Sequence, residues 1–394
     1  MAIDGKRESC STVGDSRRPI PFLSFFTGAG LLDLGFIQQG FTAAWANECS
    51  EVFADAHDFA FSQRIGHGSC SITSRRSITD TSPRAILAEA FGQLGSPSTF
   101  GVIGGPPCPD FSVMGQHKGE NGKNGHLSQV YVNRILALRP AFFVFENVAG
   151  LVRIARHRAF FDRLKAQLSE DYHVDWAVLN ALDYGVPQDR RRLFLIGLRR
   201  SWACVQLHDS LHASIRAAEA GERKHWFPWP TPAYPNAVHA YAWPDEVPHY
   251  GAEPPAPKGL PEELMVGTHI LSRGLELLPN GQDCFRPYSK RFLEVPEGQD
   301  CNKSFKRLHR WRYSPTVAYG NNEVHLHPTE PRRLTVREAM VLQSLPNEYE
   351  LPDDMPLCHK FKTVGNGVPV KLARSVADSL GKVLRGASDD EDRV

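Results

Sequence analysis

The stretch Pro21-Phe-Leu-Ser-Phe-Phe-Thr27-Gly-Ala-Gly30 is a short apolar run that stops at two glycines. The next residues, Leu31–Gln39, carry apolar side chains at the spacing of one helix face. The combination predicts a buried strand, a glycine turn and a helix, with the turn at the carboxyl end of the strand.

The same alternation continues along the first half of the chain. Further strands are expected at Thr42–Asn47, Phe100–Ile103, Ala141–Phe145, Val174–Leu179 and Leu193–Leu198, and helices at Val52–Phe61, Val130–Leu138 and Ala159–Leu168. Strands that alternate with helices predict an α/β fold with a parallel, doubly wound sheet. Such sheets bind ligands at the carboxyl ends of their strands, so polar residues there are the first candidates for a site.

Changes in composition and in the spacing of apolar residues divide the chain into five segments. After Arg200 the sequence becomes rich in proline, histidine and aromatic residues, and helical spacing returns only at Leu334–Leu345, where Thr335 and Glu338 form a capping box. The expected segments are a disordered leader (1–19), an α/β domain (20–200), an irregular second domain (201–328), a helical piece that rejoins the first domain (329–385) and a disordered acidic tail (386–394).

Composition places the chain among ordinary globular proteins. It has 394 residues, 41% hydrophobic and 23% charged, enough to bury a large core without disulfides or structural metal. The eight cysteines are scattered without a CxxC pair, which favours a reduced, cytoplasmic chain. No apolar run approaches the roughly 18 residues that would span a bilayer.

The charge is nearly balanced overall but unevenly distributed. A net charge of +1 excludes a wholly basic, histone-like binder of nucleic acid. However, Leu151–Arg200 holds ten Lys and Arg against six Asp and Glu, and Arg286–Arg337 holds eleven against five. These two stretches either form ordinary solvated faces or line a basic cleft for one polyanion.

The glycine turn and the end of the second strand indicate a nucleoside cofactor. The turn Phe26-Thr-Gly-Ala-Gly30 permits close approach of the backbone to a ligand, and Glu48 ends the next strand, where an acid commonly binds ribose hydroxyls. A tight turn without a ligand is the alternative. No Gly-Lys-Ser/Thr follows, so a P-loop is not supported.

Two reactive groups follow later strands. Cys108 lies between two prolines after a Gly-Gly pair that ends a strand, so it occupies a constrained loop rather than the buried position usual for a cysteine. Glu146 and Asn147 end the next strand and could point into the same crevice. Burial would raise the proton affinity of Glu146 and suit it to donate a hydrogen bond, whereas a capping or surface role is the alternative.

A basic segment, Gln188-Asp-Arg-Arg-Arg192, precedes the last strand. Alternate residues of an extended chain share a face, so Gln188, Arg190 and Arg192 are expected to point together. Their guanidinium groups suit phosphate or carbonyl oxygens, and a solvated basic turn is the alternative.

These residues resemble the motifs of the cytosine-C5 DNA methyltransferase family, in family order. The resemblance covers about residues 20–200 and 330–380. It rests on Phe26-Thr-Gly-Ala-Gly30, Asn47-Glu48, Gly105-Pro-Pro-Cys108, Glu146-Asn-Val148, Gln188-x-Arg-x-Arg192, Arg332-x-Leu-Thr-x-x-Glu338 with Leu342-Gln343, and Gly365-Asn-Gly-Val368. Ser24, Ser71-Ile72, Asn124 and Gly367 depart from the usual pattern, which has Asp, Asp-Ile, Arg and a small Ser or Ala at these places.

The resemblance implies a Rossmann-like methyltransferase sheet, with 20–200 as the catalytic domain that binds S-adenosylmethionine and 201–328 as a smaller, irregular target-recognition domain. It implies that Cys108 attacks C6 of a flipped cytosine, that Glu146 holds N3 and the exocyclic amine, and that Arg190 and Arg192 hold O2 or a nearby phosphate. The cofactor contacts it implies are Phe26, Gly28, Ala29, Gly30, Glu48, Ser71, Ile72, Pro107, Asn366 and Val368.

The resemblance also implies partners and leaves alternatives. The expected partner is duplex DNA, with a cognate restriction enzyme or another defence-system partner, a monomeric chain, no metal, and a bacterial or phage-like setting. A methyltransferase that acts on RNA is the nearest alternative, followed by a catalytically silent DNA-binding protein. A zinc protein is weaker, because His67 and Cys70 are close in sequence but Cys49 and His57 lack the spacing of a structural site.

Overall fold

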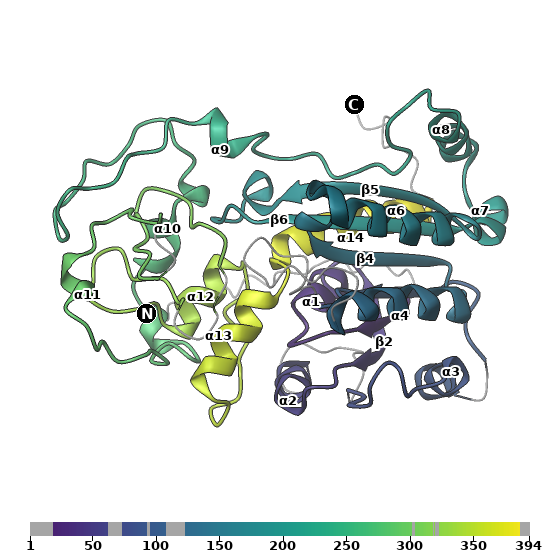
Figure 1. Ribbon diagram of the computed structural model, residues 1–394, viewed down its shortest axis with the longest axis horizontal. Helices are drawn as coiled ribbons and strands as arrows, with labels where there is room; N and C mark the ends of the chain where they lie inside the picture. The colour runs from purple at the N-terminus through teal and green to yellow at the C-terminus, as the bar shows by residue number, and fades with distance from the viewer. Residues whose placement is uncertain are drawn as a thin grey trace, which may run out of the picture.

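A six-stranded sheet covered by helices on both faces forms one part of the molecule, and an irregular region of loops and short helices forms the other (Figure 1). The computed structural model describes residues 19–61, 73–92, 95–107, 123–301, 304–317, 319 and 323–386, with the side chains of 123–125 excepted.

The sheet has the strand order β2-β1-β3-β4-β6-β5. Its strands are β1 (Ile20–Phe25), β2 (Phe41–Asn47), β3 (Gly101–Gly104), β4 (Phe142–Val148), β5 (Tyr172–Asn180) and β6 (Arg191–Arg199). Strands β1 to β4 pair in parallel, but β6 runs antiparallel to both β4 and β5.

The expected all-parallel sheet is therefore wrong for β6. Only residues 181–190, including the 3-10 turn η4 (Ala181–Tyr184), connect β5 to β6. A parallel neighbour would need a crossover of a dozen or more residues, so this short connection forces the chain to turn back. As a result, the start of β6 lies at the same edge as the end of β4, where Val148 pairs with Arg192.

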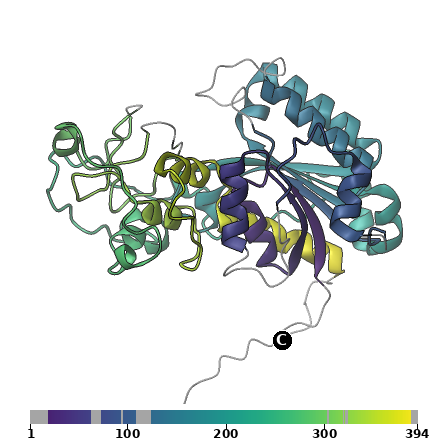
Figure 2. The same cartoon turned by 90° about the horizontal axis from the view of Figure 1, so that it is seen from below.

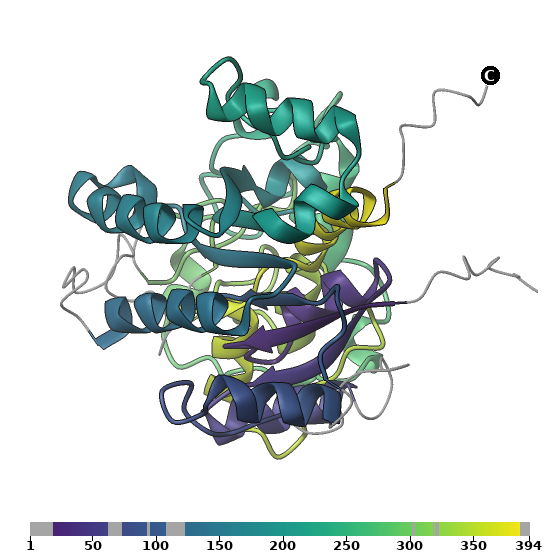
Figure 3. The same cartoon turned by 90° about the vertical axis from the view of Figure 1, so that its right-hand side faces the viewer.

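Two apolar layers cover the sheet. On one face, α1 (Leu31–Ile37) and α14 (Val370–Arg385) pack on Phe22, Phe142 and Phe194. On the other face, α4 (Lys123–Leu138) and α6 (Ala155–Ser169) pack on Phe143 and Phe145 (Figure 3). The remaining helices of this part are α2 (Glu51–Ala60), α3 (Pro83–Phe91), α5 (Gly150–Arg153), α7 (Arg200–Gln206) and α8 (Asp209–Glu219).

The last helix returns to the beginning of the chain. Helix α14 lies along α1 beside the first strands (Figure 2), so closely that a Cβ on Gly35 would lie 2.5 Å from the Cβ of Ala373. Glycine at position 35 is what allows the two helices to approach. This contact joins the two ends of the described chain in one core.

The irregular region begins later than the change of composition suggests. Trp202, Ala203, Ile215, Trp226 and Phe227 are buried in the same core as the sheet. Beyond them, the described residues hold only short elements and isolated bridges up to α12. These elements are α9 (Ala237–Ala240), η5 (Glu262–Leu264), α10 (Val266–Ile270), η6 (Leu275–Leu277), α11 (Arg291–Glu294), α12 (Val336–Leu342) and α13 (Leu357–Asn366).

The capping box predicted for α12 is confirmed. The Thr335 hydroxyl accepts from the Glu338 amide, and the Glu338 carboxylate accepts from the Thr335 amide. These bonds satisfy two amides at the start of the helix, which would otherwise have no partner in the helix. No described helix is long and apolar enough to cross a membrane.

Two buried histidines in the irregular region are held in the neutral form. Burial lowers the pKa of His309 and of His327 to about 4. In each ring Nδ1 accepts a backbone N–H, from Trp311 at 3.0 Å and from Glu330 at 3.1 Å, which a protonated nitrogen could not do.

We predict that these two histidines make the folded protein less stable in mild acid. Below the ordinary pKa of 6.5 these histidines are protonated in the unfolded chain, whereas in the folded chain they stay neutral until about pH 4. Their contribution to the free energy of unfolding, present above pH 6.5, is therefore lost as pH falls. Below about pH 4 each histidine lowers the free energy of unfolding by on the order of 3 kcal/mol relative to its value above pH 6.5. In His309→Asn, which keeps an acceptor for the Trp311 amide, the unfolding temperature should fall less steeply with pH than in the wild type. His249→Gln, at an exposed position, is the control and should follow the wild type. Equal slopes in wild type and His309→Asn would contradict the prediction.

Candidate active site

Polar groups from β1, β2, β3, β4 and β6 gather at one edge of the sheet, where the parallel strands end and β6 begins. The order of strands brings the glycine turn after β1, Glu48 after β2 and Glu146 at the end of β4 to this edge. Ligands of open α/β sheets bind at this position.

The glycine turn has a conformation that requires its glycines. Gly28 and Gly30 have φ of 57° and 80°, and a Cβ on Gly30 would lie 2.3 Å from the Phe61 ring. Phe26 also has a positive φ, of 54°, which is uncommon for a bulky residue and marks the turn as strained.

Asp33 holds this turn in place, and sequence reasoning did not single it out. Its buried carboxylate accepts from the hydroxyls of Ser24, at 2.7 Å, and Thr27, and lies 3.3 Å from Nε2 of His57. Ser24, where the family usually has an aspartate, thus donates to an acid in the following helix. An acid on the otherwise apolar face of a short helix was the signal available in the sequence.

Glu48 lies beside the glycine turn and retains capacity for a ligand. Its Oε2 accepts from the Gly28 amide at 3.1 Å and its Oε1 from the Ser50 amide at 2.9 Å. A carboxylate has about four lone-pair sites, so the two oxygens of this partly exposed residue, with one backbone donor each, can still accept ribose hydroxyls. This donor set fits a nucleoside cofactor.

The end of α13 lies against the start of α1. Asn366 is exposed and Val368 is buried. Between them, a Cβ on Gly367 would lie 2.3 Å from Leu31 Cδ2, so glycine replaces the family's usual small residue where α1 comes closest. This contact carries Asn366 and Val368 to the side of the glycine turn.

Glu146 and Arg192 form a largely buried ion pair. Arg192 Nε lies 3.1 Å from Glu146 Oε1, and each side chain is 12% exposed. Burial raises the pKa of Glu146, and the positive charges of Arg192 and Arg190 only partly offset this effect. Glu146 is thus shifted toward the protonated form, which can donate a hydrogen bond.

The segment that leads to Cys108 contacts this pair. A Cβ on Gly105 would lie 2.6 Å from Glu146 Oε2, so glycine leaves room for the carboxylate. Asn147 Nδ2 donates to the Pro106 carbonyl at 3.3 Å and ties the segment to the end of β4. Pro107 is partly exposed, and Cys108, Ser71 and Ile72 lie outside the described residues.

The surroundings of Arg190 differ from those expected of a residue that contacts a substrate. Its guanidinium is 1% exposed and donates to the carbonyls of Val317 at 2.9 Å, Gly365 at 2.7 Å and Gly367 at 2.9 Å. Gln188 is also buried and donates to the Leu342 carbonyl. Of the three residues expected on one face, only Arg192 pairs with Glu146, whereas the guanidinium of Arg190 is taken up by backbone carbonyls.

The described residues hold no cluster of three His, Cys, Asp or Glu side chains that could bind a metal ion. His57, one of the candidate zinc ligands, has its ring nitrogens 3.3 Å from Asp33 and 2.9 Å from Thr73.

Comparison with known proteins identifies the family. The model of the C-5 cytosine-specific DNA methylase family matches residues 20–382. The type II methyltransferase M.NmeDI of Neisseria meningitidis serogroup C is 41% identical and covers 96% of this chain and 88% of its own length. M.XorII of Xanthomonas oryzae pv. oryzae is 33% identical, with 93% and 86% covered.

Solved structures agree on the fold. A protein encoded within an E. coli prophage superimposes with a TM-score of 0.63 at 21% identity, over 93% of this chain and 99% of its own. The S. pombe Dnmt2 methyltransferase gives 0.56 at 11% identity, over 92% and 98%.

The fold is that of an α/β methyltransferase, and the polar groups at its glycine turn fit a nucleoside cofactor. The chain belongs to the C-5 cytosine-specific DNA methylase family. It is a DNA cytosine-C5 methyltransferase that uses S-adenosylmethionine, and the family match favours DNA over the RNA alternative.

Proposed function

We propose that the enzyme methylates C5 of a flipped-out cytosine at specific sites in duplex DNA, through a covalent bond between Cys108 and C6. The Glu146–Arg192 pair carries this proposal, because it lies beside Gly105, three residues before Cys108. A cytosine inside a duplex is stacked and paired, so an enzyme must extrude it before reacting with its ring.

Cys108 is the nucleophile in this mechanism. Its thiolate adds to C6, and the electrons of the C5–C6 double bond make C5 nucleophilic. S-adenosylmethionine, when bound, supplies the methyl group that C5 takes up. A base, for which water suffices, then removes the C5 proton, the double bond re-forms and Cys108 leaves.

Glu146 stabilises the ring during these steps. Its raised pKa favours the protonated carboxyl, which donates to N3 and accepts from the exocyclic amine. Arg192 orients that carboxyl through the contact of Nε with Oε1, and its guanidinium faces O2 of the cytosine or a nearby phosphate.

The residues around the glycine turn are assigned to the cofactor. Glu48 binds the ribose hydroxyls, and the backbone of Gly28–Gly30 allows close approach. Further contacts are assigned to Phe26, Ala29, Ser71, Ile72, Pro107, Asn366 and Val368.

Target recognition is assigned to the irregular region. Because residues up to Trp229 pack against the sheet core, we place its start after Trp229 rather than at residue 201, and its end near residue 328. Sequence readout needs a surface of its own, which an irregular region of this length supplies. By analogy with the type II relatives, we assign the enzyme to a restriction–modification system, as a cytoplasmic monomer with a cognate restriction enzyme.

One assay tests the proposal. The enzyme is incubated with S-adenosylmethionine labelled in its methyl group and with either plasmid DNA or RNA, and methylated cytosines are mapped by bisulfite sequencing. We expect C5-methylcytosine at one short sequence in DNA alone. Label in RNA alone would replace the proposal with the RNA enzyme, and label in neither would favour a silent DNA-binding protein.

Arg190 is proposed as a positioning residue that couples β6 to Gly365–Gly367. In Arg190→Lys a single ammonium cannot serve all three carbonyls, and each buried carbonyl left without a donor costs about 1–3 kcal/mol. We expect a lower free energy of unfolding in urea, together with weaker binding of S-adenosylhomocysteine by calorimetry, because the carbonyls of Gly365 and Gly367 flank Asn366. The exposed variant Arg216→Lys is the control. Wild-type affinity for S-adenosylhomocysteine in Arg190→Lys would refute the coupling.

A further inference from the structure

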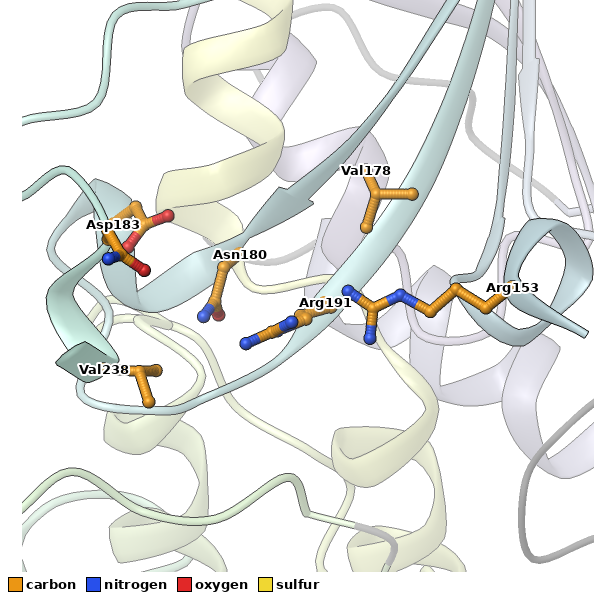
Figure 4. A pocket seen from close by; sticks show the side chains of 7 residues that line it. Arg153, Val178, Asn180, Asp183, Arg191 and Val238 are labelled. Atoms are coloured by element: carbon orange, nitrogen blue, oxygen red, sulfur yellow. The ribbon is translucent and has the colours of Figure 1, made fainter.

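A polar cleft opens at the same edge of the sheet as the Glu146–Arg192 pair, between the strand ends and α9 (Figure 4). It has a volume of about 240 Å³ and is lined by Arg153, Asn180, Asp183, Arg191 and Asn236, with two valines. None of these residues has a part in the mechanism above.

The cleft and the catalytic pair lie on opposite faces of β6. Consecutive residues of a strand point to opposite faces, so Arg191 and Arg192 diverge from neighbouring positions. Asn180 pairs with Arg191 across the sheet and points to the same face. Arg153 ends α5, which follows directly on β4, the strand that carries Glu146. Arg191, which lines the cleft, is thus the sequence neighbour of Arg192, which pairs with Glu146.

The cleft presents two guanidinium groups that are weakly neutralised. The side chain of Arg153 points toward the position of Arg191 on β6, and the side chain of Arg191 points on toward Asn180 (Figure 4). Arg153 is exposed, and within the described ranges no carboxylate pairs with its side chain. Arg191 Nε lies 3.6 Å from Asp189 Oδ1, and such a long, partly exposed ion pair contributes little.

The acids near the cleft are otherwise engaged. Asp189 Oδ1 also accepts from Asn180 Nδ2 at 2.9 Å. Asp183 accepts from the Ala237 amide at 2.9 Å, and burial raises the pKa of its carboxyl. Two guanidinium groups that line one cleft, with amide groups beside them, are an arrangement expected of a site for an anion.

We propose that this cleft binds a backbone phosphate of the DNA strand that carries the target cytosine, within a nucleotide or two of the flipped base. The inference rests on the proposed function, because that function brings DNA to this edge. Because the cleft is open and polar, it can admit one phosphate of a DNA strand that continues on either side. A guanidinium group can bind two oxygens of a phosphate at once. The contact would position the strand without reading its sequence.

The test measures how DNA binding depends on salt in Arg153→Gln, Arg191→Gln and the double variant. The probe is a short duplex taken from a plasmid site that the wild type methylates, mapped by bisulfite sequencing. Loss of the one phosphate contact should reduce the slope of log K against log salt by about 0.9 in the double variant, and by no more than that in either single variant. The fall in affinity should be equal for target and non-target duplexes. Arg216→Gln, an exposed change on α8 with the same charge difference, should leave the slope unchanged.

A second measurement locates the phosphate. Duplexes with a neutral methylphosphonate at single positions near the target cytosine should weaken wild-type binding at one position that does not weaken Arg191→Gln. Wild-type slopes in both single variants and the double variant would overturn the inference. So would saturation of the cleft by inorganic phosphate with unchanged DNA binding in the variants, which would mark it as a small-anion site. Methylation by the wild type is scored separately, so failure of the proposed function is distinguishable from failure of the cleft.

Discussion

Cys108→Ser should abolish methyl transfer, by on the order of 10³-fold or more, and leave the affinity for S-adenosylhomocysteine unchanged. A serine hydroxyl has the shape of the thiol but is almost wholly protonated at neutral pH and is a far weaker nucleophile. The reason to expect a specific loss is the position of Gly105 beside Glu146 and the bond from Asn147 to the Pro106 carbonyl, because Cys108 follows these residues in the sequence. Transfer is measured with labelled cofactor, and binding by calorimetry.

A control variant distinguishes the loss of the nucleophile from the loss of any other cysteine. Cys204 is exposed on α7, and Cys204→Ser should behave as the wild type. In a duplex with 5-fluorocytosine at the target the fluorine cannot leave as a proton does, so a covalent adduct should accumulate in the wild type and map to the Cys108 peptide. Near-normal turnover by Cys108→Ser, or no adduct in an active enzyme, would exclude attack at C6.

The sequence predicted the layout of the sheet because its strands are apolar runs that end at glycine or at polar residues. It did not predict the direction of β6, since an isolated run carries no sign of its direction and the short connection 181–190 decided it. It also suggested a boundary at residue 201, because proline and aromatic content changes there. Trp202 and Trp226 are nevertheless buried in the core of the sheet, since composition does not report which surface an aromatic residue covers.

The site was predictable where function depends on one motif and not where it depends on tertiary contacts. Glu48 and Gly28 could be paired from the order of the strands, and the structure brings them within 3.1 Å. The roles of Asp33 and Arg190 could not, because the partners of Arg190 lie 127 to 177 residues away in the chain. Two arginines of one motif thus have different surroundings, one against Glu146 and one against backbone carbonyls.

Glu146→Gln should lower kcat by about 10²–10³-fold, with little change in the affinity for DNA. The amide can still bond to the cytosine, but it cannot supply the acidic proton that a carboxyl with a raised pKa holds against N3. The pH profile distinguishes this role from a structural one. In the wild type the rate should rise as Cys108 ionises and fall again as pH passes the raised pKa of Glu146, because the deprotonated carboxylate cannot donate. In Glu146→Gln the falling limb should vanish.

Unfolding in urea is compared for both proteins, because the change also removes the buried partner of Arg192. Glu170→Gln, an exposed change at the end of α6, should keep both limbs. A falling limb that persisted in a folded Glu146→Gln protein would show that another group titrates and that Glu146 does not act as the donor.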